Sequence, residues 1–97
     1  MASRDEFVAK MHQKLDELNA KIDDLSRRAR KERGELRESI EKEERDLQEQ
    51  KRDAESRLAR IREASGDAWE ELREGAEQAW RKFKDSVDRA VSRFQHH

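Results

Sequence analysis

The chain has 97 residues, of which 48% are charged and 32% hydrophobic, and its 23 basic and 24 acidic residues nearly cancel. Disorder is disfavoured, because disordered chains usually combine a large net charge with many Pro and Gly residues, and this chain has no Pro and three Gly. Without cysteine, disulfides and thiolate metal sites are excluded. The composition is typical of long helices and coiled coils.

The charge balance also removes the electrostatic reason to expect nucleic acid as a partner, so we expect none. The first 15 residues hold no apolar core of the length that a signal peptide needs, and no later segment resembles a membrane span. We therefore expect a cytoplasmic protein. Residues 1–97 are expected to form one helical coiled-coil unit, divided into a heptad segment (4–33), a charged middle (34–64) and an aromatic segment (65–95).

In the heptad segment, apolar residues recur in alternating steps of four and three. They are Met11, Leu15, Leu18, Ile22, Leu25 and Ala29. This spacing is the seam of a heptad coiled coil, so it predicts an amphipathic helix that packs against another helix.

Beyond Leu25 the apolar spacing changes to eleven residues. Steps of eleven reach Leu36, Leu47, Leu58, Trp69, Trp80 and Val91, and a second series runs through Ile61, Leu72, Phe83 and Phe94. A third series runs through Ala54, Ser65, Ala76 and Val87. Eleven residues make three helical turns, so these series predict an undecad helix with one apolar face, which carries both tryptophans.

Two glycines are the possible break points of the helix. They are Gly34 and Gly66, the second within Ser65-Gly66-Asp67. The eleven-residue spacing passes through both without a change of phase, and one glycine inside a helix costs only about 1 kcal/mol. We therefore predict an all-α, elongated, self-associating coiled coil, with one long helix hinged near Gly66 and a full length of about 145 Å. The alternatives are a helical hairpin and a three-helix bundle.

The apolar stripe is predicted to be an interface between copies of the chain, because large apolar side chains on a helix need a partner surface. The predicted interface residues are Met11, Leu15, Leu18, Ile22, Leu25, Leu47, Leu58, Ile61, Trp69, Leu72, Trp80, Phe83, Val87, Val91 and Phe94. Two alternatives use the same face: docking on a membrane surface, for which Trp and Phe opposite a charged face are typical, and binding a different helical protein as an adaptor.

No catalytic, cofactor-binding or metal site is expected. The basic run 27–33 would spread around a helix and present no single face to a nucleic-acid groove. His12 and Asp16 are four residues apart but make too weak a ligand set for a metal, and His96 and His97 lie at the chain end. Acidic residues are abundant, but an elongated helix offers no desolvated pocket to shift their pKa values, so we expect no enzymatic activity.

The aromatic segment also carries a pattern: G-x-A-W, followed by A-W and R-x-F. Its specific residues are Gly66, Trp69, Gly75, Trp80 and Phe83. Together with the earlier KLDELNAKIDDL, this layout resembles the small coiled-coil stress-response proteins of bacteria first noted in cyanobacteria. The resemblance implies an association with salt or general stress, without a catalytic activity. The resulting hypothesis is a structural or protein-interaction coiled-coil protein with a stress-related role.

Overall fold

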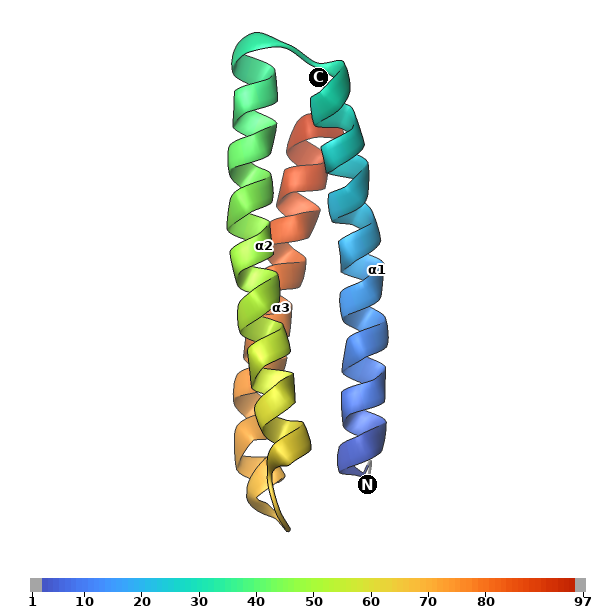
Figure 1. The fold of residues 1–97 in the computed structure, drawn as a ribbon, viewed down its shortest axis with the longest axis vertical. Helices are drawn as coiled ribbons and strands as arrows, with labels where there is room; N and C mark the ends of the chain where they lie inside the picture. Colours follow the sequence, from blue (N-terminus) through green and yellow to red (C-terminus); the bar gives the residue numbers. More distant parts are fainter. Residues whose placement is uncertain (1–2, 96–97) are drawn as a thin grey trace.

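A computed structural model describes residues 3–95, and these form three α-helices and no strand. The helices are α1 (Arg4–Lys31), α2 (Gly34–Glu63) and α3 (Ala68–Gln95). Figure 1 shows them side by side, with α2 antiparallel to the other two, in a bundle that measures 52 × 18 × 16 Å. The prediction of an all-α protein is confirmed, and the helices occupy the segments 4–33, 34–64 and 65–95.

The chain does not form the single long helix, because the chain reverses direction at Gly34 and at Gly66. Gly34 has φ 67° and Gly66 has φ 57°, the left-handed region that glycine adopts without steric cost. Glu32, Arg33 and Ala64 beside them are extended. The structure is therefore the three-helix alternative, and its long axis of 52 Å replaces the expected length of about 145 Å.

The unbroken eleven-residue spacing of apolar residues does not indicate whether the chain turns at the two glycines. Once the chain reverses, each helix needs only its own apolar stripe directed at the bundle axis, whatever its phase relative to the previous helix. Folding back lets three stripes bury one another within one chain, which is where most helical stability comes from.

The buried residues recur every seven residues in all three helices, also where an undecad was expected. The main rows are Val8, Leu15, Ile22 and Ala29 in α1; Ile40, Leu47, Ala54 and Ile61 in α2; and Trp69, Ala76, Phe83 and Ala90 in α3. Leu72, which the eleven-residue series places on the buried face, is 37% exposed. Within α3 the eleven-residue pairs Ala76–Val87 and Phe83–Phe94 are buried as well, so both spacings occur on its buried face and Leu72 is the member that departs from the series.

Polar contacts between helices set their register. Between α1 and α2, Lys51 Nζ donates to Asn19 Oδ1 at 2.6 Å and Ser26 Oγ donates to the Glu44 carboxylate. At the far end of the same pair, Arg4 Nη1 donates to the carbonyl oxygen of Ala64 at 2.5 Å. A slip of one residue would break these contacts as well as turn the apolar rows outward, so they specify one alignment.

Candidate functional site

The structure places most of the predicted interface inside a single chain. Twelve of the fifteen residues are buried in the bundle core: Met11, Leu15, Leu18, Ile22, Leu25, Leu47, Leu58, Ile61, Trp69, Phe83, Val87 and Phe94. Trp80 and Val91 are partly buried and pack against this core, and Leu72 is exposed. The burial of the stripe therefore requires no second copy of the chain.

Trp80 and Val91 both border the contact between α1 and α3, which is the least extensive of the three helix contacts. A groove runs along this contact. Its lower part, near the start of α1, encloses about 770 Å³ and has a floor of Phe7, Met11 and Trp80. We call this lower part the Trp80 groove.

Trp80 has two unusual contacts in this groove. The ammonium of Lys14 lies 4.4 Å from its ring centroid, a cation–π contact from α1 to α3. Its indole nitrogen Nε1 is buried and has no hydrogen-bond acceptor among residues 3–95. Buried indole N–H groups usually find an acceptor, and leaving one unpaired is unfavourable. The Lys14 ammonium thus lies over the ring, and the indole N–H group has no hydrogen-bond acceptor within residues 3–95.

At the lower end of the groove, aromatic rings join α1 to the start of α3. The Phe7 and Trp69 ring centroids are 6.0 Å apart with planes inclined at 40°, a favourable tilted arrangement. The guanidinium of Arg73 lies 5.9 Å from the centre of the Phe7 ring. Phe7 thus packs between Trp69 and Arg73 at this end of the groove.

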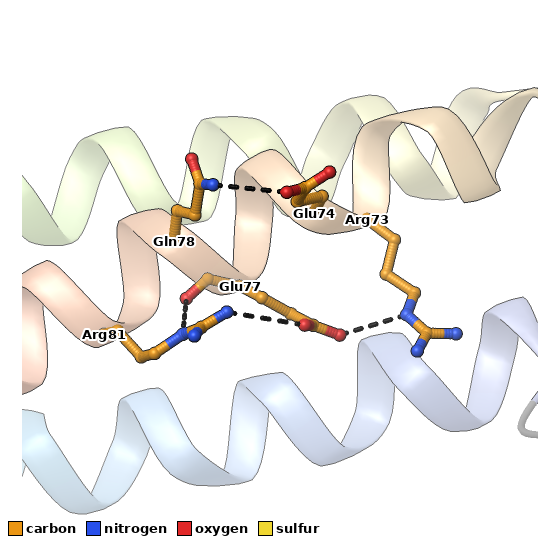
Figure 2. A network of polar contacts seen from close by, with 5 residues as sticks. All are labelled: Arg73, Glu74, Glu77, Gln78 and Arg81. Atoms are coloured by element: carbon orange, nitrogen blue, oxygen red, sulfur yellow. Dashed lines mark hydrogen bonds and ion pairs between the residues drawn. The ribbon is translucent and has the colours of Figure 1, made fainter.

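An ion-pair row follows the α3 wall. Glu77 Oε1 accepts from Arg73 Nε at 3.0 Å, and Glu77 Oε2 lies 3.7 Å from Arg81 Nη2. Figure 2 shows this carboxylate between the two guanidinium groups, on the side of α3 that faces α1, with the Gln78–Glu74 hydrogen bond further round the helix. Both arginines of the α3 wall thus have a carboxylate partner, although this wall keeps one net positive charge.

The α1 wall carries the same net charge, but its cations are not paired with a carboxylate of the described residues. Lys10 and Lys14 line it together with Glu6, and neither lysine forms an ion pair within residues 3–95. Counting both walls, the Trp80 groove carries two more positive than negative charges. Because the whole chain has a net charge of −1, the groove is positive relative to its surroundings.

Further up the α1–α3 contact, an ion-pair cluster closes the groove. Asp88 accepts from Lys84 at 2.8 Å and from Lys21 of α1 at 3.2 Å. The hydrogen bond from Lys84, reinforced by Lys21, lowers the pKa of Asp88 below its ordinary value, and the same bond raises the pKa of Lys84. Beyond this cluster lies a smaller hollow of about 370 Å³ beside Leu25 and Val91.

The clefts that α2 forms with α1 and with α3 lack an apolar floor. The cleft between α1 and α2 encloses about 580 Å³, and Ala29 is its one apolar lining residue. The cleft between α2 and α3 encloses about 510 Å³, with Ala90 in that position. Both are lined mainly by charged side chains, so the Trp80 groove is the one of these three with large apolar groups at its floor.

The remaining candidates from the sequence have simple structural positions. His12 Nε2 lies 2.9 Å from Arg62 Nη2 of α2, and since a guanidinium can only donate, the histidine nitrogen accepts. Asp16 is exposed, and the run 27–33 forms the end of α1 and the first turn, with Arg27 paired to Asp24. His96 and His97 lie outside the described residues. Within 3–95, no three His, Asp or Glu side chains cluster as metal ligands would.

Sequence reasoning missed the polar row of α1 that faces α2. His12, Asn19 and Ser26 are spaced by seven residues, and each contacts a polar side chain of α2. The signal was available, since the row runs parallel to the apolar seam. The Trp80 groove had no such signal, because its two walls are far apart in the sequence.

Comparison of the chain with family models, with curated proteins and with solved structures finds no match. The residues that carry the family resemblance have structural roles in the bundle: Gly66 in the second turn, Trp69 and Phe83 in the core, and Trp80 at the groove floor. No helix within the described residues is long and apolar enough to cross a membrane.

Proposed function

We propose that the protein is a non-catalytic interaction module that binds a helical segment of another protein in the Trp80 groove. The observation that carries this proposal is the groove over Phe7, Met11 and Trp80, in which the partly buried Trp80 ring is the accessible apolar group, between the two helices that touch each other least. A groove of this kind accepts the apolar face of an amphipathic helix, with anchors at i, i+3, i+4 and i+7. A docked fourth helix would complete a four-helix arrangement.

A partner protein fits this groove better than a second copy. In a two-fold dimer the same surface patch lies on both sides of the contact. Two Trp80 grooves brought together would oppose like charges across a partly desolvated interface, which is unfavourable. Self-association through the full apolar stripe, or docking of that stripe on a membrane, would first require the bundle to open, because residues such as Ile22 and Phe83 are fully buried.

A non-catalytic role agrees with the electrostatics. Catalytic acids and bases usually have pKa values shifted by burial in a cleft. The pKa shifts of Asp88 and Lys84 arise instead from a mutual ion pair on the surface. A stress-related role stays a prediction from the family resemblance, and helix binding would give such a role a physical basis.

The first test is the mass of the protein by light scattering over a range of concentrations, where we expect a monomer. The second is an NMR titration with a synthetic 21-residue amphipathic peptide whose heptads carry leucine on one face and glutamine on the other. Amide shifts are expected around Phe7, Met11 and Trp80. Shifts confined to another face, or a stable dimer that masks the groove, would contradict the proposal.

A further inference from the structure

We infer that the Trp80 groove selects an acidic amphipathic helix, and that Lys10 and Lys14 are its specificity-determining residues. This inference rests on the proposed function and adds the chemistry of the partner. Its starting point is the asymmetry between the two walls of the groove: the cations of one wall are engaged with a carboxylate, and those of the other wall are not.

On the α3 wall, the Glu77 carboxylate lies between Arg73 and Arg81 (Figure 2), so these guanidinium groups already have an anionic partner. On the α1 wall, Lys10 has no ion pair or hydrogen bond within residues 3–95, and Lys14 rests on the Trp80 ring with no carboxylate beside it. An incoming carboxylate therefore gains two partners on the α1 wall without breaking an existing ion pair.

The spacing of these lysines defines the partner further. Lys10 and Lys14 are one helical turn apart, about 6 Å along the axis of α1. A helix lying in the groove presents acidic residues at the same separation when they occur at i and i+4, or at i and i+3. Its leucine-type anchors would then meet Phe7, Met11 and Trp80. The class of partner is thus a helix with an apolar stripe and an acidic pair one turn apart beside it.

Lys14 takes part in both the ionic and the apolar contacts with the partner helix. In the unbound chain its ammonium lies over the Trp80 ring, 4.4 Å from the ring centroid. When a partner carboxylate draws the ammonium away, the ring becomes available to an apolar anchor. Acidic charge on the partner therefore opens the apolar floor as well as pairing with the rim, and binding should alter the environment of Trp80.

Glu6 is the acidic group at the rim that opposes this preference. It lies one turn before Lys10 on α1, and no ion pair joins the two. With Glu77 engaged by two arginines, Glu6 leaves the α1 wall with one net positive charge. The preference is therefore predicted to be moderate and to weaken as salt rises, since exposed charges are screened beyond about 10 Å at 0.1 M salt.

The test compares two synthetic 21-residue peptides with the same leucine heptads, one with glutamate and one with lysine at the flanking positions. Binding is measured by tryptophan fluorescence and calorimetry at low and at physiological salt. We expect the acidic peptide to bind about tenfold more tightly, as two rim ion pairs allow. The double variant Lys10→Glu/Lys14→Glu should reverse that order.

A matched control is Lys82→Glu, an exposed α3 lysine that does not line the groove. It makes a charge change of the same kind and should leave the order intact, and circular dichroism checks that each variant is folded. Binding of both peptides with equal affinity would leave helix docking standing and overturn the acidic preference. A preference that survives the double variant would overturn the role of the two lysines. Binding of neither peptide would overturn both proposals.

Discussion

Replacement of Phe83 by alanine tests whether the apolar stripe closes within one chain. The Phe83 side chain is completely buried in the bundle, and removing a buried phenylalanine usually lowers stability by about 3 to 5 kcal/mol. A domain of this size is stable by only about 5 to 15 kcal/mol. Phe83→Ala should therefore remove a large part of the total stability.

Leu72 supplies the matched comparison. It belongs to the same eleven-residue series as Phe83, so an interface built on that series predicts a large loss at both positions. In the bundle Leu72 is 37% exposed, and alanine is the better helix former, so Leu72→Ala should lower stability by less than about 1 kcal/mol.

The assay is urea unfolding followed by circular dichroism, repeated at protein concentrations that differ a hundredfold. In an intramolecular bundle the midpoint does not depend on concentration, whereas an obligate oligomer becomes more stable as concentration rises. Similar losses for both variants, or a midpoint that rises with concentration, would refute the intramolecular core.

Four further variants test the turns, the ion pairs and the register. Gly66→Ala should lower the unfolding free energy by about 1 to 2 kcal/mol, because the left-handed backbone disfavours a Cβ although no atom lies within 4 Å of one. Gly75→Ala should instead raise the unfolding free energy by up to about 1 kcal/mol, since at this helical position only the end of a flexible arginine side chain has to move. Urea unfolding measures both glycine variants, and a change of the same sign in both would contradict the turn assignment. Asp88→Asn removes a carboxylate whose pKa is lowered by Lys84. The difference in stability between this variant and the parent chain should be fully present above pH 3.8 and disappear as the pH falls through the lowered pKa. Unfolding curves between pH 2 and 7 check this, and a difference that persists at the lowest pH would count against it. Asn19→Ala should lower stability by about 1 kcal/mol, because a lysine of α2 loses its acceptor; an unchanged midpoint would show that the contact contributes nothing to the register.

Much of the helical structure could be predicted from the sequence. The four-and-three spacing from Met11 to Leu25 lies on the buried face of α1, as expected. Gly34 and Gly66 were recognised as the possible breaks. The prediction that the helix continues through them was wrong, because an unbroken eleven-residue spacing was taken as evidence for one continuous helix. Phase through a turn has no physical meaning once the chain leaves the helix, and a helix of 28 residues is too short to separate the seven- and eleven-residue spacings by inspection.

The candidate site was much less predictable. Trp80 stood out in the sequence as a large apolar residue of the stripe, and the structure does place it at the edge of the core. That Lys14 would cover its ring could not be foreseen, because the two residues are brought together only by two chain reversals. The same holds for Glu77: its position between two arginines is local, but its place on a groove shared with α1 is tertiary.

The sequence by itself determined that this protein is helical, where each apolar stripe lies, and where the chain is able to turn. These properties are local, since they depend on side-chain spacing along 3.6-residue turns and on the backbone freedom of glycine. Only the tertiary structure decided that the stripes bury one another within one chain, and which members stay at the surface. That outcome depends on how three helices share the area around one axis, with α1 and α3 in the least extensive contact. The groove between them, in which Lys10 and Lys14 form no ion pair within residues 3–95, is the result.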